Sequence, residues 1–140
     1  MTLSAATSSH ASKGSECLTH GVRVTVEPSF EPGHSIASEK RYVFSYRVRI
    51  ANESDRRVKL LSRRWLIIDS SGETNIVEGD GVVGEQPVIE PGSVYQYSSW
   101  CPMPVRWGTM EGTFTMAAEP DETIRVKISR FYLVAPDDAE

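Results

Sequence analysis

Three glycines in the middle of the chain have the spacing of a dinucleotide-binding motif. Gly79, Gly81 and Gly84 fit the pattern G-x-G-x-x-G, in which amides at the start of a helix hold a pyrophosphate. That chemistry requires a helix directly after the glycines. Here Pro87 comes three residues after Gly84, and Pro91-Gly92 is a turn signal, so no helix can begin there. We therefore predict that the glycines serve a bulged or tightly turned β segment, where a positive φ or a close backbone approach is needed.

Anion binding is a second chemistry that the same segment leaves open. Backbone amides of a glycine-rich bend can form an anion-binding nest, and the guanidinium groups of Arg63 and Arg64 could add paired donors for a phosphate. Glu78, Asp80 and Glu85 flank the glycines and would repel such an anion. The ligand site that the sequence predicts comprises Gly79, Gly81, Gly84, Arg63 and Arg64.

Residues 100–107 have the composition of a contact surface. Two prolines predict that no strand ladder continues through this segment, and its Trp and Met side chains provide the adaptable surface that is enriched at interfaces. We predict Trp100, Met103 and Trp107 as partner-binding residues. The alternative is that the two tryptophans cap the open end of the fold. Trp65, by contrast, lies within an alternating pattern and is predicted to be a buried anchor of the core.

Catalytic and metal-binding patterns find little support in the sequence. His10, His20 and His34 belong to no catalytic triad and to no zinc-protease spacing. Cys17 and His20 have a Cys-x-x-His spacing, which is half of a possible metal site, but no matching second half follows. We predict that the protein is not an enzyme and that it needs no metal and no cofactor.

The net charge of −4 hides two blocks of opposite sign. Nine of the fifteen basic residues lie between positions 40 and 64 with only two acidic residues, which gives a local charge of +7. Residues 65–105 contain six acidic residues and no basic one. We predict that neighbouring strands place the two blocks side by side as cross-strand ion pairs. The alternative is that the blocks steer charged partners through their local potential.

The elements that must position these residues are almost all strands. Phase slips at Leu60-Leu61 and before Phe131 predict β-bulges, and no segment has the pattern of a helix. A chain of 140 residues is long enough for one domain with a substantial core. We predict a two-sheet antiparallel β-sandwich of the fibronectin type III or immunoglobulin kind, with a barrel as the alternative. Seven alternating stretches supply its strands, at residues 22–27, 42–50, 58–68, 74–77, 94–100, 109–116 and 124–133.

The ends of the chain are expected to lie outside this domain. Residues 1–19, rich in Ser, Thr and Ala near the start, are predicted to be a disordered tail, residues 20–136 the sandwich, and residues 137–140 an acidic tail. The start lacks the pattern of a secretory signal, and no apolar run approaches a membrane span. A cytoplasmic location with Cys17 and Cys101 as free thiols is the simplest interpretation, while one disulfide is left open.

A series of short motifs makes the chain resemble the ApaG family from about Val22 to Pro136. They are Val24-Thr25-Val26-Glu27-Pro28, Tyr42-Val43-Phe44-Ser45-Tyr46, Leu61-Ser62-Arg63-Arg64-Trp65, the glycine segment from Val77 to Pro87, Tyr95-Gln96-Tyr97, Met110-Glu111-Gly112-Thr113-Phe114 and Phe131-Tyr132-Leu133-Val134-Ala135-Pro136. The resemblance implies a fibronectin III-like sandwich. The family usually has Arg-His-Trp where this chain has Arg63-Arg64-Trp65, so a role of that histidine does not carry over.

What the resemblance implies for function is protein binding. Bacterial members are linked to cobalt tolerance and magnesium efflux, and related domains in eukaryotic F-box and polymerase-interacting proteins look like protein-binding modules. We therefore predict a non-enzymatic interaction module that presents loops and an edge strand to a protein partner of unknown identity. No nucleic acid and no membrane is expected as a partner, and a homodimer is left open. The alternative is a small-ligand sensor that binds a phosphate or nucleotide anion at Gly79–Gly84.

Overall fold

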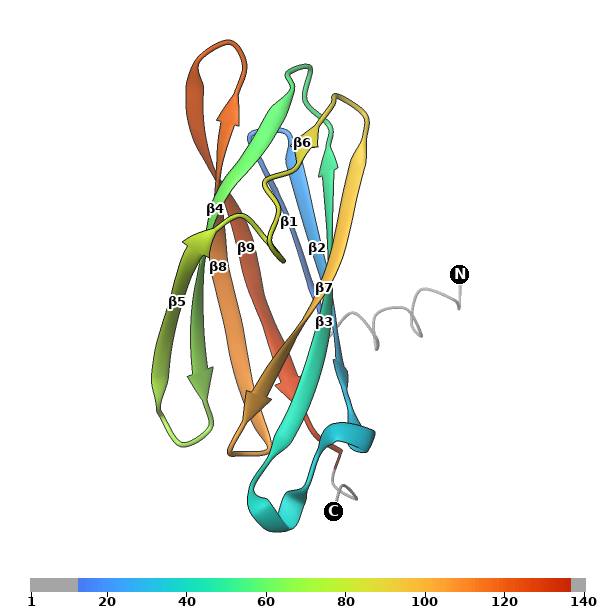
Figure 1. Cartoon of the computed structure of the whole chain (residues 1–140), viewed down its shortest axis with the longest axis vertical. Helices are drawn as coiled ribbons and strands as arrows, with labels where there is room; N and C mark the ends of the chain where they lie inside the picture. Colours follow the sequence, from blue (N-terminus) through green and yellow to red (C-terminus); the bar gives the residue numbers. More distant parts are fainter. Residues whose placement is uncertain (1–12, 137–140) are drawn as a thin grey trace, which may run out of the picture.

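Alternating apolar residues build two antiparallel sheets that pack face to face in the computed structural model, which describes residues 13–136 (Figure 1). The first sheet has the order β1-β2-β3-β7, with β1 Ser15–Thr19, β2 Val22–Phe30, β3 Tyr42–Asn52 and β7 Val94–Met103. The second has the order β5-β4-β8-β9, with β4 Val58–Asp69, β5 Thr74–Asp80, β8 Trp107–Ala118 and β9 Glu122–Val134; β6 (Val88–Ile89) also pairs with β4. The predicted sandwich is confirmed, and the barrel alternative is wrong.

The core lies between the two sheets and is centred on an aromatic cluster. The ring of Trp65 on β4 meets Tyr46 of the opposite sheet at a centroid distance of 5.5 Å and Phe131 on β9 at 5.8 Å, both edge to face. Phe114 on β8 completes the cluster at 6.3 Å. Such edge-to-face pairs add about 0.5–1.5 kcal/mol each to the burial of the rings. Trp65 is therefore the buried anchor that its strand pattern predicted.

A β-bulge decides that Trp65 faces inward. The pairing of β4 with β8 shifts between Leu60 and Ser62, which confirms the predicted slip. Leu60 is buried, so strict alternation would turn Trp65, five residues later, to the outer face. The extra residue at the bulge reverses the phase, and Trp65 then packs in the core. The slip predicted before Phe131 is confirmed by the shifted pairing of β8 with β9 between Met110 and Gly112.

The structure corrects three strand predictions. Nine strands are present among residues 13–136 rather than about seven, because β1 and the two-residue β6 were missed. β1 falls within residues 1–19, which were predicted to be disordered, but it pairs with β2 along its whole length. The rest of that prediction, residues 1–12, and the acidic tail at 137–140 lie outside the described residues. β7 continues to Met103 through Pro102, since an edge strand can place a proline on its unpaired side.

Two connections complete the description of the fold. Residues between β2 and β3 form two short 3-10 helices, η1 (Pro32–His34) and η2 (Ala37–Glu39). No helix of the described residues is long and apolar enough to cross a membrane. On one side of the sandwich β1 approaches β9, and the amide of Tyr132 donates to the carbonyl of Lys13 at 2.8 Å. This side is therefore closed by contacts between the two sheets.

Candidate functional site

The glycine segment forms a tight hairpin turn rather than the start of a helix. The amide of Val82 donates to the carbonyl of Glu85 at 2.8 Å, and the amide of Glu85 donates back at 2.9 Å. Val83 and Gly84 between them have φ angles of 43° and 83°, both positive as in the two-residue turns that favour glycine. Gly81 also has a positive φ, of 62°. The prediction of a tightly turned β segment is confirmed.

Gly81 is required by a close backbone approach as well as by its φ angle. A Cβ atom at this position would lie 2.1 Å from the carbonyl oxygen of Glu85. The neighbouring Val82 side chain is buried and belongs to the hydrophobic core, and Figure 1 shows the segment after β5 leading into β6, between β4 and β7 in this view. Tyr95 on β7 donates its hydroxyl to Glu85 at 3.1 Å. The glycine segment therefore acts as a plug that helps to close one side of the sandwich.

Arg63 donates its hydrogen bonds to backbone carbonyl oxygens of this segment. It does not lie beside free amides with which it could share an anion. Its Nη1 atom donates to the carbonyls of Asp80 at 3.1 Å and Gly81 at 2.9 Å. Gly79 leaves the room for this guanidinium, since a Cβ there would lie 2.9 Å from Nη1. The Gly81 amide itself donates to the carbonyl of Leu61 at 2.9 Å. Gly79 and Gly81 lie against Arg63 but Gly84 does not, and the amides of Gly81, Val82 and Glu85 are already used within the chain.

A shallow polar trough of about 730 Å³ lies on the outer face of the second sheet. Small hydroxyl side chains occupy its middle strands, where Ser62 pairs with Thr115. On the side formed by β4 and β5, Arg64 forms an ion pair with Glu78 at 3.3 Å. Arg125 lies on the opposite side, on β9. The lining of the trough consists of Ser62, Arg63, Arg64, Glu78, Gly79, Asp80, Thr113, Thr115 and Arg125.

Three of the five predicted ligand residues line this trough, namely Arg63, Arg64 and Gly79. Gly81 is buried, and Gly84 lies in the hairpin turn. The sequence analysis missed the hydroxyl residues and Arg125. The alternation of Thr113 and Thr115 with apolar neighbours would have placed them on one face of β8, but only strand register shows that this face adjoins Arg64.

The two charge blocks meet as cross-strand pairs at two places. Arg64 of the basic block pairs with Glu78 of the acidic block, and Arg57 pairs with Glu90 at 3.0 Å. Both pairs are exposed, so each contributes little to stability. These contacts confirm the predicted cross-strand pairing at these positions.

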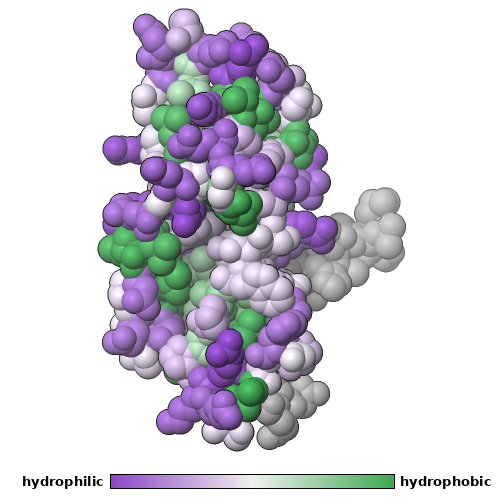
Figure 2. Space-filling view, in the orientation of Figure 1, coloured by the Kyte–Doolittle hydropathy of each residue, from purple (hydrophilic) through white to green (hydrophobic). Residues whose placement is uncertain are grey.

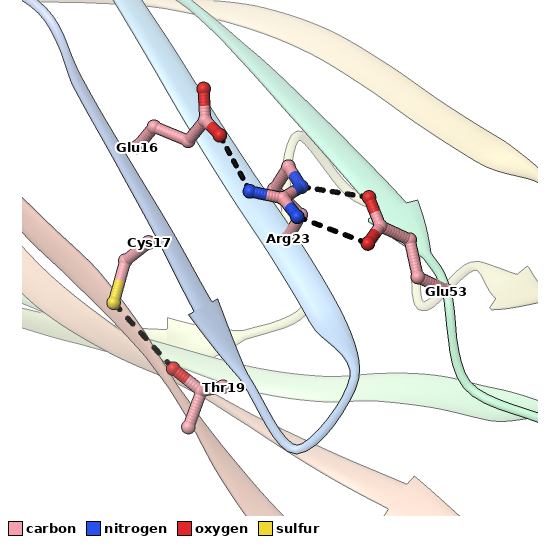
Figure 3. Close-up of polar contacts among 5 residues, drawn as sticks. All are labelled: Glu16, Cys17, Thr19, Arg23 and Glu53. Atoms are coloured by element: carbon pink, nitrogen blue, oxygen red, sulfur yellow. Dashed lines mark hydrogen bonds and ion pairs between the residues drawn. The ribbon is translucent and has the colours of Figure 1, made fainter.

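A stronger cluster lies on the first sheet. Figure 3 shows the Arg23 side chain between Glu16, at 2.6 Å, and Glu53, to which it donates two hydrogen bonds. The hydrogen bonds from Arg23 hold the pKa of Glu53 below its ordinary value. This cluster joins β1, β2 and the end of β3 and has the geometry of a structural ion-pair network.

The predicted contact residues of segment 100–107 lie in three different places. Trp100 is 52% exposed on the outer face of the first sheet, with its ring edge-on to His34 at 5.0 Å. Trp107 is 47% exposed and begins β8 on the outer face of the second sheet. Met103 is only 4% exposed and packs beside Gly108, so its prediction as a partner-binding residue is wrong. Neither tryptophan is buried as a plug would be.

Several apolar side chains lie on the outer face of the second sheet, with Thr109 and Glu111 of β8 between them. We call this surface the apolar half of that face. Trp107 is opposite Val134 on β9, and Tyr132, two residues earlier, is exposed on the same face. Figure 2 shows an apolar area over β5, where Ile76 is exposed. The apolar half consists of Leu66, Ile68, Ile76, Trp107, Tyr132 and Val134.

The reactive groups of the core are held in inert forms. Burial raises the pKa of the Cys101 thiol to about 11, so the thiol is protonated at neutral pH. Burial also raises the pKa of Tyr97, whose hydroxyl has no hydrogen-bond partner among residues 13–136. Cys17 and Cys101 are both free thiols. Within the part of the chain that the structure describes, no three His, Cys, Asp or Glu residues gather as a metal site.

Known proteins with similar sequence and structure share one family. A model of the ApaG domain matches residues 32–118. Protein ApaG of Brucella suis is 45% identical over 120 residues, which are 86% of this chain and 92% of that protein. Protein ApaG of Anaeromyxobacter dehalogenans is 43% identical, with 87% and 96% of the two chains covered. The crystal structure of a Bordetella pertussis protein named ApaA superposes with a TM-score of 0.80 at 39% identity, over 83% of this chain and 94% of that one.

Proposed function

The chain belongs to the ApaG family, as its motifs predicted, and we propose that the protein is a non-enzymatic interaction module that binds another protein. The observation that carries this proposal is the apolar half of the second sheet's outer face. It exposes two aromatic side chains, Trp107 and Tyr132, on neighbouring strands. Large apolar side chains exposed together on one face of a folded domain are typical of an interaction site.

The arrangement of the apolar half resembles that of a protein interface. Trp107 and Tyr132 are diagonal neighbours across β8 and β9, a spacing that aromatic side chains can bridge. Trp and Tyr are the residue types that most often dominate binding energy. Glu111, opposite Leu66 on β4, forms an ion pair with Arg130 at 2.7 Å and supplies polar groups beside the aromatic residues. The two aromatic residues are therefore our candidates for the anchor of the partner.

The proposal is tested by capture of cross-linked partners from the native cell. We expect the double variant Trp107→Ala, Tyr132→Ala to lose a partner that the wild-type chain retains. Trp100→Ala is the matched control, because it removes an equally exposed tryptophan from the opposite sheet. A partner lost with Trp100→Ala but retained by the double variant would overturn the assignment of the surface. Identical capture by all three chains would overturn it as well.

A small-ligand sensor is the second candidate function, and the trough is the observation that favours it. Arg64 and Arg125 project from this face together with three hydroxyl side chains, a set that could hold a phosphate group. Against it, Arg64 is already paired with Glu78 and Arg63 is bound to backbone carbonyls. Protein binding therefore remains the primary proposal. We propose further that the protein acts in the cytoplasm. We also propose that any effect on cobalt tolerance or magnesium efflux is exerted through its protein partner.

A further inference from the structure

Among residues 13–136 the two sheets have four edge strands, of which β1 and β9 approach each other while β5 and β7 pair on one side only. On the closed side, Ser15 on β1 donates its hydroxyl to the carbonyl of Ser129 on β9 at 2.7 Å, which adds to the bond between Lys13 and Tyr132. Near the end of β7, Pro102 lacks an amide hydrogen at an outward-facing position, which protects that part of this edge. β5 is seven residues long and contains no proline and no lysine, the residues that usually protect an edge.

The backbone groups that β5 presents to solvent can be assigned from its contacts with β4. The Gly81 amide donates to Leu61, and the Glu73 carbonyl accepts from Asp69, so odd-numbered positions face β4. Because these directions alternate in an antiparallel pair, the amides and carbonyls of the even-numbered positions point away from the sheet. These are Thr74, Ile76, Glu78 and Asp80.

We propose that β5 pairs antiparallel with β5 of a second copy of this chain, which joins the two second sheets into one continuous sheet. The full-length register places Val77 opposite its own copy. Ile76 then lies opposite Glu78, and Thr74 lies opposite Asp80. In this register every outward-facing residue meets another outward-facing residue, so their amides and carbonyls form ladder hydrogen bonds; the Asp80 carbonyl also accepts from Arg63.

The charges and side chains of β5 favour a second copy in this orientation. The two carboxylates lie at one end of the strand, so antiparallel pairing sends them to opposite ends, whereas parallel pairing would set each beside its own copy. Glu78 is also neutralised by Arg64. Ile76 and Val77 are 53% and 40% exposed at the centre of the strand and become covered. The interface is isologous, as in most homodimers; it shares Ile76 with the apolar half but does not include Trp107 or Tyr132.

The register is tested by a disulfide across the two-fold axis. Val77 and its copy form a non-hydrogen-bonded pair, whose Cα atoms are about 4.5 Å apart, within the range of about 4.4–6.8 Å that a disulfide spans. In a Cys17→Ser background we expect Val77→Cys to form a covalent dimer on mild oxidation. Val94→Cys, 42% exposed on β7, is the matched control and should stay monomeric. Absence of the Val77→Cys dimer, or equal cross-linking of the control, would overturn the proposal.

A charge pair tests the same register without a disulfide. Ile76→Glu places a carboxylate directly opposite Glu78 of the other copy, whereas Ile76→Lys places an ammonium group there. With two such contacts per dimer, we expect Ile76→Glu to weaken self-association about 2- to 30-fold and Ile76→Lys to preserve or strengthen it, as measured by sedimentation equilibrium. Two results would contradict the pairing of β5 between copies: a wild-type chain that is monomeric at millimolar concentration, or two variants that shift self-association in the same direction. A monomer whose β5 binds an unrelated strand would also contradict it.

Discussion

Residues 79–87 stay beside one sheet, whereas residues 100–107 cross from one sheet to the other. Because β5 and β6 both pair with β4, the segment between them turns back on itself, with the amides of Val82 and Glu85 bound within the turn and that of Gly81 bound to β4. The second segment leaves β7 in the first sheet and enters β8 in the second. Its side chains are therefore distributed over both outer faces and the core. A connection between strands of one sheet can fold against that sheet and contribute to the core. A connection between the two sheets places some of its side chains on the outer face of each sheet.

The largest expected effect separates a tryptophan of the core from a tryptophan of the crossing segment. Trp65→Ala removes the centre of the aromatic cluster and should lower the free energy of unfolding by about 3–5 kcal/mol. Trp107→Ala removes a half-exposed side chain and should lower it by less than about 1 kcal/mol. Urea denaturation at equilibrium measures both values. Equal destabilisation by the two variants would show that Trp107 is a structural cap and unsuited to anchor a partner.

The second prediction separates two glycines of the same motif. Gly81→Ala places a methyl group against the Glu85 carbonyl at a positive φ and should destabilise by about 3 kcal/mol or more. Gly84→Ala has open space around it and carries only the penalty of its φ, about 1 kcal/mol. Thermal or urea unfolding of both variants measures the difference. If the two glycines prove equally tolerant, the segment does not act as a plug.

The strands and their phases were accessible from the sequence because a half-buried strand shows its burial locally, in the period of its apolar residues. Val22, Val24 and Val26 illustrate this, and so does the bulge beside Leu60. β1 was missed because its burial alternates only weakly, between intermediate and exposed positions. Its stability comes from pairing with β2, which no local pattern reveals.

The candidate site was less accessible, because it depends on which strands become neighbours. Met103 has the composition of a contact residue, yet β7 turns it into the core beside Gly108. Arg63 and Arg64 are adjacent in sequence but point to opposite faces of β4, so one binds the glycine segment and the other pairs with Glu78. The face of each side chain follows from the bulge and the register, and composition does not encode either.

The third prediction uses these two adjacent arginines. Arg63→Ala removes a charged donor from two carbonyls of the glycine segment and should destabilise by about 1–2 kcal/mol. Arg64→Ala removes only an exposed ion pair and should change the stability by less than about 0.5 kcal/mol. Urea denaturation of both variants in low salt measures the contrast. A larger loss for Arg64→Ala would mean that the trough, and not the plug, is the structurally sensitive region.

The smallest expected effect is the response to anions. Pyrophosphate, ATP or NAD at millimolar concentration should leave the melting temperature nearly unchanged, because the amide of Gly81 and the guanidinium of Arg63 are already bound within the chain. A ligand at 100 times its dissociation constant would instead add about 2.7 kcal/mol of stability. Arg125→Ala is the informative variant, since Arg125 lines the trough without contributing to the plug. A clear thermal shift that disappears in Arg125→Ala but survives in Lys59→Ala, a basic residue outside the trough, would place the ligand-sensor function ahead of protein binding. It would also show that the polar part of the second sheet's outer face, rather than its apolar half, is the functional surface.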